Sequence, residues 1–245
     1  PKQAISRMAG AIAKTESPMI AKSLIGAFAR HYRVDLREAL LPSLVNYNSF
    51  NEFFTRPLAS GARPIANDPK AVVSPADGYL SQFGKIMNDC VLQAKGRDFS
   101  LEQLLNDTDL ARSYDNGSFL TVYLSPRDYH RIHAPTNSRI RRTIEIPGTL
   151  FPVNNNAVDS IPNIFCKNER LVCVFDDYSV VLVGAFLVAS IETVWDGPQS
   201  PYQTIRERLV CRPFNRGEEI ARFLIGSTVI VLFPEDGLTF NCELL

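Results

Sequence analysis

One stretch near the C-terminus constrains the fold of this 245-residue chain more than any other. Residues 223–233 are apolar except for a small step at Gly226, Ser227 and Thr228. An apolar run of this kind predicts a buried β-strand. Gly226 has no Cβ, so its backbone can adopt strained angles and its carbonyl can be approached closely. The stretch therefore predicts a buried strand in which a hydroxyl lies beside an accessible peptide carbonyl.

Two interpretations of this step remain open on these residues alone. The structural one is a strand with a glycine bulge. The chemical one is an N-to-O acyl shift, in which the Ser227 Oγ attacks the carbonyl of Gly226 and breaks the chain. The second interpretation needs support from other parts of the sequence.

Composition excludes several classes of protein. Hydrophobic residues make up 45% of the chain, and 26 basic side chains balance 26 acidic ones, which indicates a globular protein and does not suggest nucleic-acid binding. The five cysteines form no C-x-x-C pair and there are only three histidines, so we expect free thiols and no metal site. The longest apolar run, residues 180–189, is too short to span a bilayer.

The N-terminal part has helical patterns. Within Pro18–Tyr32, the spacing of Ile20, Leu24 and Phe28 predicts an amphipathic helix, and residues 3–14 are a weaker second candidate. The first 33 residues carry six basic side chains and one acidic one. A basic amphipathic helix can lie in a membrane interface. The alternative is that its apolar stripe packs on the protein's own core, and both remain open.

Short helices and strands are expected further along. Capping-box patterns that start at Asp35, Ser49 and Ser100 predict three short helices. Strands are predicted over residues 118–124, 171–175, 179–188, 192–195 and 223–233, and loops over residues 154–156 and 196–215. We therefore predict an α+β fold, in which an N-terminal helical segment (residues 1–65) packs on a mostly antiparallel β-sheet domain (residues 66–245).

Three polar side chains are candidates for acid–base chemistry. His130 and His133 lie three residues apart after a predicted strand, and imidazole exchanges protons near neutral pH. Asp77 follows Pro75 and precedes Gly78, which is equally typical of a turn aspartate. Catalytic and structural roles both remain open for these side chains on their own.

Seven short blocks, taken together and in order, give the chain a specific resemblance. They are residues 50–58 (FNEFFTRPL), 75–78 (PADG), 123–133 (YLSPRDYHRIH), 147–151 (PGTLF), 168–170 (NER), 190–195 (SIETVW) and 226–228 (GST). From about Tyr32 to its end, the chain resembles phosphatidylserine decarboxylases of the bacterial membrane type.

The resemblance implies that the protein processes itself. Asp77 and His133 match the acid and base of the family's triad, and Ser227 matches its nucleophile. Cleavage between Gly226 and Ser227 would give a large subunit (1–226) and a small subunit (227–245). Ser227 would then become dehydroalanine and finally an N-terminal pyruvoyl group, the covalent cofactor, so neither pyridoxal phosphate nor a metal is expected.

The resemblance also implies roles in turnover. The pyruvoyl group would form a Schiff base with the serine headgroup, and decarboxylation of phosphatidylserine would yield phosphatidylethanolamine. His130 matches a residue that contacts the substrate. Phe151 lies in a loop expected near the lipid and could contact an acyl chain, and the alternative that it is a core residue remains open. Four arginines are candidates for the headgroup phosphate by composition only, with a solvated basic face as the alternative: Arg131, Arg139, Arg141 and Arg142.

The expected partners follow from the same resemblance. They are a phospholipid substrate, a membrane surface bound peripherally at its cytoplasmic face, the two subunits of one precursor, and a second copy in a homodimer. Two other hypotheses remain. One is a serine hydrolase that uses Asp77, His133 and Ser227, although no G-x-S-x-G motif is present. The other is a non-catalytic β-domain that binds lipid or a partner.

Overall fold

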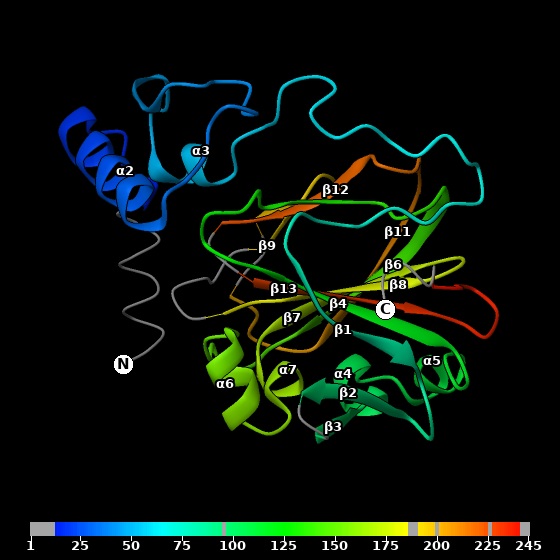
Figure 1. The fold of residues 1–245 in the computed structure, drawn as a ribbon. Coiled ribbons are helices and arrows are strands. Elements are labelled where there is room, and N and C mark those ends of the chain that lie inside the picture. The colour runs from blue at the N-terminus through cyan, green and yellow to red at the C-terminus, as the bar shows by residue number, and fades with distance from the viewer. Residues whose placement is uncertain (1–12, 95–96, 186–190, 199–200, 225–226, 241–245) are drawn as a thin grey trace.

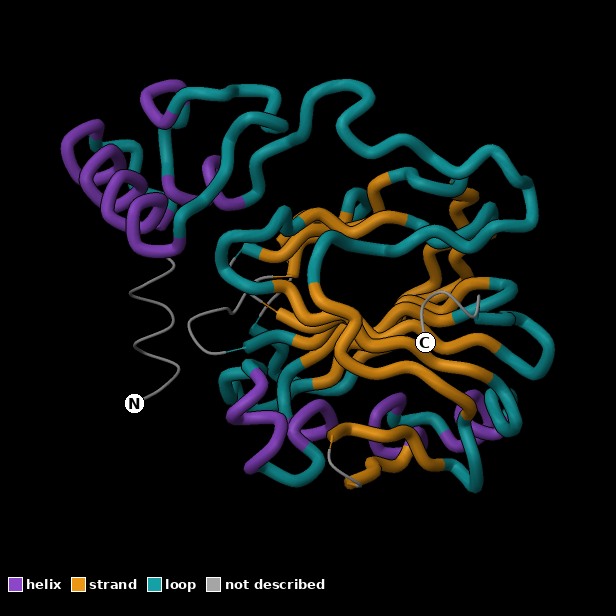
Figure 2. The backbone as a smooth tube through the Cα atoms, viewed as in Figure 1, coloured by secondary structure: helices purple, strands orange, loops and turns teal. Residues whose placement is uncertain are grey.

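The protein consists of layers around one large sheet, with a helical unit at its N-terminus (Figures 1 and 2). The structure is a computed structural model that describes residues 13–94, 97–185, 191–198, 201–224 and 227–240. A seven-stranded sheet forms the middle layer. A four-stranded sheet covers one face and short helices cover the other, as Figure 1 shows. The predicted α+β class is confirmed.

The helices are short apart from the first. They are α2 (Pro18–Tyr32), the 3-10 helix η1 (Leu44–Asn46), α3 (Phe50–Phe54), α4 (Leu101–Leu105), α5 (Thr108–Arg112), α6 (Asn155–Ser160) and α7 (Ile164–Lys167). The first strands are β1 (Tyr79–Lys85), β2 (Cys90–Ala94), β3 (Arg97–Ser100), β4 (Ser118–Leu124), β5 (Arg131–His133) and β6 (Ser138–Ile146). The others are β7 (Arg170–Phe175), β8 (Ser179–Val183), β9 (Ile191–Thr193), β10 (Gly197–Pro198), β11 (Arg206–Phe214), β12 (Glu219–Phe223) and β13 (Ser227–Phe233).

The large sheet has the strand order β1-β4-β13-β8-β7-β6-β11, and the small sheet has the order β10-β9-β12-β5. Strand β13 is central and buried on both faces. Val229 and Val231 pack into the core that includes residues of the small sheet, whereas Ile230 and Leu232 pack into the core that includes α4 and α7. Successive side chains of a strand point to opposite faces, so a strand covered on both sides is apolar throughout.

The single strand predicted over residues 223–233 is wrong. Strand β12 ends at Phe223 and β13 begins at Ser227, and the two strands belong to different sheets. Phe223 at the end of β12 and all of β13 are buried, so the apolar run of the sequence continues from one strand to the next. The predicted cleavage site therefore falls at the crossover rather than inside a strand. Gly226 itself lies outside the described residues.

Two predicted loops are also wrong in part. Within residues 196–215, Arg206–Phe214 forms strand β11, which pairs with β6 at the edge of the large sheet. Most residues of β11 are charged or exposed, so the segment lacks the apolar pattern of an inner strand. Within residues 154–156, the side chain of Asn154 accepts a hydrogen bond from the N–H of Ala157 and caps α6.

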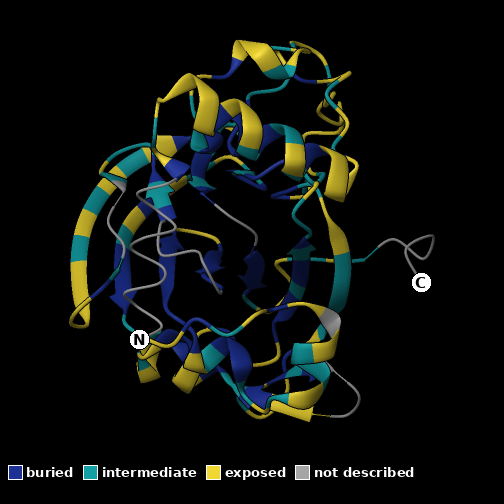
Figure 3. Ribbon diagram, turned by 90° about the vertical axis from the view of Figure 1, so that its left-hand side faces the viewer, coloured by how far each residue is buried: buried dark blue, intermediate teal, exposed yellow. Residues whose placement is uncertain are grey.

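The N-terminal helix α2 has the predicted bounds, and it presents two different faces. Ala21, Ile25 and Ala29 are buried, whereas Met19 and Ile20 are 79% and 50% exposed. Figure 3 shows this mixture of buried and exposed residues on the outer helices. Among the described residues, no helix is both long enough and apolar enough to cross a bilayer.

The capping-box predictions have mixed outcomes. Ser49 accepts a hydrogen bond from the N–H of Glu52 at the start of α3, and Ser100 caps α4 in the same way, so both of these predictions are confirmed. The prediction at Asp35 is wrong. Its carboxylate binds the side chain of Arg37, and a turn forms in place of a helix.

Candidate active site

Ser227 is fully buried at the first position of β13. Its backbone pairs with Leu124 of β4, and its side chain is 0% exposed. Its Oγ has no hydrogen-bond partner among the described residues. Burying a hydroxyl without a partner costs about 1–3 kcal/mol, so its retention calls for an explanation such as a chemical role.

His130 lies beside the connection that leads to Ser227. The backbone N–H of Phe223, the last residue of β12, donates to the carbonyl of His130 (3.0 Å). His130 directly precedes β5, which pairs with β12 in the small sheet. The crossover from β12 to β13 therefore starts at a residue hydrogen-bonded to His130.

The imidazole of His130 is neutral and has one free lone pair. Its Nδ1 lies 2.8 Å from the carbonyl oxygen of Asp128, so Nδ1 carries the proton and donates it. Its Nε2 is buried without a partner among the described residues. The pKa of His130 is lowered to about 3, mainly by burial and to a smaller extent by the Arg56 cation. The hydrogen bond to Asp128 acts in the opposite direction. Nε2 is thus an unprotonated acceptor in a dry environment.

His133 is held at both ring nitrogens. Nδ1 lies 2.8 Å from the carbonyl oxygen of Gly217 and must donate to it, so Nε2 accepts the hydrogen bond from the Tyr129 hydroxyl (3.0 Å). The two rings stack at 5.6 Å. Burial raises the pKa of Tyr129 to about 12, which keeps the phenol protonated and able to donate at neutral pH. The basic nitrogen of His133 therefore faces Tyr129, a residue that the sequence analysis did not select.

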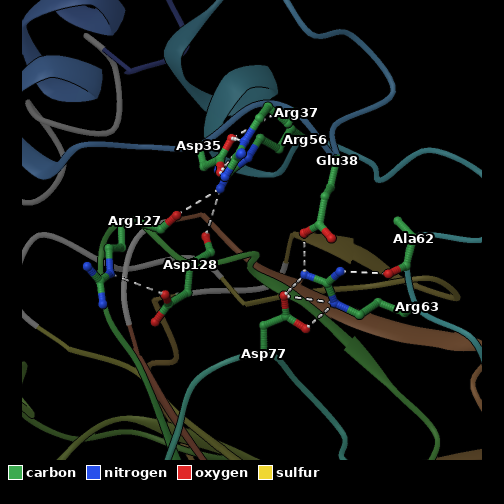
Figure 4. A network of polar contacts seen from close by, with 9 residues as sticks. All are labelled: Asp35, Arg37, Glu38, Arg56, Ala62, Arg63, Asp77, Arg127 and Asp128. Atoms are coloured by element: carbon green, nitrogen blue, oxygen red, sulfur yellow. Dashed lines mark hydrogen bonds and ion pairs between the residues drawn. The ribbon is translucent and has the colours of Figure 1, made fainter.

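Asp77 lies just before β1, and its carboxylate is bound by Arg63. The Nε and Nη2 atoms of Arg63 contact the two carboxylate oxygens at 3.0 and 2.5 Å, and Nη2 also contacts Glu38 at 2.9 Å (Figure 4). Within the described part of the chain, no hydrogen bond joins Asp77 to His133. The two segments are nevertheless adjacent, since the backbone N–H of His133 donates to the carbonyl of Pro75 (2.8 Å).

The candidate site has an open side and a closed side. An open pocket of about 670 Å³ is lined by Arg63, Asp77, Gly78, Tyr123 and Arg127, among others. Ser227 and His130 are not among its lining residues and are fully buried. The acidic member of the predicted triad therefore faces solvent, while the nucleophile lies in the interior.

Phe151 is held in a loop that is fixed by one buried amide. The Oδ1 of Asn168 accepts from the N–H of Phe151 (3.0 Å), and its Nδ2 donates to the carbonyls of Phe151 (2.9 Å) and Gly184 (2.8 Å). A Cβ at Gly148 would collide with the backbone of residues 168 and 169, so glycine allows this close approach. Phe151 is half-buried and packs against the core on the helical side of the large sheet.

Three of the four arginines proposed for the phosphate are already paired. Arg131 binds Glu219 (2.7 Å), Arg141 binds Asp176, and Arg142 binds Asp107 and Glu207 (both 2.7 Å). The alternative was a solvated basic face, and of these three only Arg141 is mostly exposed, whereas the side chains of Arg131 and Arg142 are 17% and 25% exposed. Arg127, at the open pocket, is a further candidate that the sequence analysis did not name.

The residues of the site fit a group generated from Ser227. The buried Oγ of Ser227 and Nε2 of His130 both lack a partner among the described residues, and the backbone of His130 is hydrogen-bonded to Phe223, four residues before Ser227. In the same described ranges, no cluster of three or more His, Cys, Asp or Glu side chains could hold a metal ion.

Comparisons with known proteins define the class of this protein. A family model described as phosphatidylserine decarboxylase matches residues 50–244, and a second, described as PSD, matches residues 1–33. The chain is 47% identical to the phosphatidylserine decarboxylase proenzyme of Herminiimonas arsenicoxydans, covering 98% of this chain and 85% of that protein. It is 48% identical to the proenzyme of Azotobacter vinelandii (96% and 87% covered) and 46% identical to that of Pseudomonas aeruginosa (98% and 88% covered).

The protein is therefore a decarboxylase, an enzyme that removes a carboxyl group as carbon dioxide. The chain belongs to the phosphatidylserine decarboxylase family.

Proposed function

We propose that this protein cleaves itself between Gly226 and Ser227 and then converts phosphatidylserine to phosphatidylethanolamine. The observation that carries the proposal is the buried, unpartnered Oγ of Ser227 at the crossover between two sheets. The relatives are named as proenzymes, which supports processing of the precursor.

The processing step is an internal acyl transfer followed by an elimination. The Ser227 Oγ adds to the Gly226 carbonyl, its proton passes to a base, and the amide nitrogen leaves with a proton to give an ester. Loss of the Cα proton of residue 227 then breaks the Cβ–O bond and releases Gly226 as a carboxylate. The dehydroalanine that remains tautomerises to an imine, and water hydrolyses it to a ketone and ammonia.

His133 is the proposed base for this step, because its unprotonated Nε2 can accept a proton once the Tyr129 hydroxyl moves aside. Gly217 already orients its Nδ1–H, a task that an aspartate performs in a catalytic triad. Asp77 would therefore act mainly through its negative charge, which would stabilise the positive charge that develops on His133 as it takes the Ser227 proton. Arg63 neutralises part of that charge in the present arrangement.

In turnover, the ketone at residue 227 would hold the serine headgroup's amine as a Schiff base and accept the electrons released as carbon dioxide leaves. The neutral Nε2 of His130 can accept a hydrogen bond or a proton from the bound headgroup. Closed surroundings strengthen such contacts, since little water competes for them. Phe151 would contact an acyl chain.

We also propose that the N-terminal segment (1–65) seats the β-rich domain (66–245) on the cytoplasmic face of a membrane. Met19 and Ile20 are exposed on α2, whereas the rest of its apolar stripe packs inward, so the two alternatives for this helix can hold together. Replacing both Met19 and Ile20 by glutamate should reduce the fraction of the protein that sediments with anionic phospholipid vesicles. The matched control is Met87→Glu, which changes a comparably exposed methionine on the β-rich domain. Equal binding by all three proteins would contradict this assignment.

Activity on a defined lipid tests the proposed function. Purified protein with phosphatidylserine in detergent micelles should form phosphatidylethanolamine and carbon dioxide, and Ser227→Ala should form neither. Release of fatty acid by an intact chain would favour the serine hydrolase, and an intact, inactive chain that binds vesicles would favour the binding domain. A homodimer of processed protomers is expected, and light scattering after size-exclusion chromatography measures it.

A further inference from the structure

Three consecutive residues at the end of α3 contact the loop that carries His130. Thr55 accepts a hydrogen bond at its carbonyl from the Nε of Arg131 (2.9 Å), while Phe54 and Arg56 make the contacts described below. All three residues are at most 6% exposed. The sequence separation exceeds 70 residues, so these contacts are a product of tertiary packing rather than of local structure.

Phe54 packs directly on the imidazole of His130. The ring centroids are 4.1 Å apart and tilted by 44°, and both side chains are 0% exposed. The hydrogen bond from Nδ1–H to the Asp128 carbonyl restrains rotation of the imidazole about its Cβ–Cγ bond through one ring atom only. The Phe54 ring limits this rotation and thereby sets the direction of Nε2.

Arg56 fixes the backbone that orients His130. Its Nη2 donates to the carbonyls of Arg127 (2.8 Å) and Asp128 (3.3 Å). The Asp128 carbonyl is the same oxygen that accepts the hydrogen bond from the Nδ1 of His130. Arg56 is 3% exposed, and its guanidinium also lies 5.7 Å from the ring of Phe53. One buried cation therefore anchors the acceptor on which the imidazole depends.

The contacts of Phe54 extend to the outer helix α2. The ring of Phe28 on α2 lies 5.8 Å from that of Phe54 in an edge-to-face arrangement. Met19 and Ile20, which we propose to face the membrane, belong to the same helix. A continuous row of contacts thus runs from the surface helix through Phe28 and Phe54 to His130.

We propose that Phe54 and Arg56 are positioning residues for His130, so that the N-terminal helical unit forms part of the decarboxylation site as well as a docking element. The proposal rests on the turnover role proposed for His130. It assigns Phe54 and Arg56 no role in the bond scission at Ser227, for which His133 is the proposed base. Loss of either contact should reduce the rate of decarboxylation without preventing maturation.

The test compares two leucine substitutions in one aromatic cluster. Phe54→Leu removes the ring on His130. The control, Phe50→Leu, removes a neighbouring buried ring that stacks on Phe54 at 5.7 Å, and no ring contact joins it to His130 within the described residues. Both changes remove a similar amount of buried apolar surface, so thermal stability should fall by similar amounts.

We expect Phe54→Leu to mature fully and to lose about tenfold in kcat at nearly unchanged KM, because small misplacements of a catalytic group are costly. Phe50→Leu should keep a kcat close to that of the unchanged protein. Histidine side-chain NMR gives an independent readout, since the chain has only three histidines. The 15N shifts of the His130 ring report its tautomer and are little affected by ring currents, and we expect the single Nδ1–H tautomer to be kept in Phe50→Leu and to become mixed in Phe54→Leu.

Arg56 provides a second pair of variants. Arg56→Lys keeps a cation but not the planar fork, and Arg56→Met keeps neither. We expect kcat to be highest in the unchanged protein, lower in Arg56→Lys and lowest in Arg56→Met. The soluble fraction of each variant should still be completely cleaved at Ser227. If the loss of buried volume were all that mattered, the leucine variants at positions 54 and 50 would lose kcat in parallel and His130 would keep the same tautomer in both, which would overturn the proposal.

The outcomes separate this proposal from the proposed function. If the unchanged protein never forms phosphatidylethanolamine, the proposed function fails. If it matures and turns over while Phe54→Leu and Phe50→Leu behave alike, only the positioning role fails.

Discussion

The buried histidine provides a quantitative prediction about stability. His130 is fully buried, and burial lowers its pKa to about 3, whereas a histidine in the unfolded chain titrates near 6.5. Between these two values the unfolded chain binds a proton that the folded protein does not. Stability is therefore unaffected by this group above pH 6.5 and falls as the pH drops below it.

The size of the effect follows from the two pKa values. At pH 5, protonation of His130 in the unfolded chain lowers the free energy of unfolding by about 2 kcal/mol relative to pH 8. The acidic groups with a lowered pKa, such as Asp35 at about 2, titrate below this window. Replacement by glutamine, which does not titrate, should remove this component and leave the contributions of the other groups unchanged.

Urea unfolding of the unprocessed Ser227→Ala protein between pH 5 and 8 measures this difference. The matched sample is the double variant Ser227→Ala/His130→Gln. We expect the free energy of unfolding to fall by about 2 kcal/mol more in the histidine protein than in the glutamine protein over this range. Equal pH dependence in the two proteins would show that His130 titrates normally when folded and would refute the argument for a neutral imidazole.

Two further substitutions test the supports of the site. In Gly78→Ala, the new Cβ would collide with the carbonyl of Tyr123, and residue 78 has a φ of 152°. The free energy of unfolding should therefore fall by about 1–3 kcal/mol. Scission should also slow, because the neighbouring Asp77 is displaced. Unfolding curves and the rate of scission measure both effects, and normal values would contradict them. Asn168→Asp removes the donor to the Phe151 carbonyl and should cost about 3 kcal/mol and raise KM for the lipid; an unchanged KM would exclude a loop role in binding.

Local patterns were sufficient to predict several elements. The spacing of apolar residues predicted α2 with its observed bounds, and the strand over residues 118–124 follows a turn at Asn116 and Gly117 as expected. The caps at Ser49 and Ser100 were predicted because each involves a side chain and a backbone group only three residues away. Short-range geometry of this kind is determined by neighbouring residues.

Contacts between distant segments could not be predicted in the same way. The partner of Asp77 is Arg63, fourteen residues earlier, and the partner of His133 is the carbonyl of Gly217. A backbone carbonyl has no sequence pattern, and an arginine in a loop resembles any solvated arginine. The crossover before Ser227 was missed for a related reason, since the end of β12 at Phe223, the connection and β13 lie in one apolar run of the sequence.

The central claim is that Ser227 becomes a ketone when the chain breaks, and the mass of the small fragment tests it most directly. Mass spectrometry of freshly purified protein should find residues 1–226 and a fragment 227–245 that is lighter by one ammonia than the same peptide with an N-terminal serine. Reduction with borohydride should add two hydrogens to that fragment. An intact chain, or a fragment that retains its N-terminal serine as ordinary proteolysis would leave it, would contradict the account.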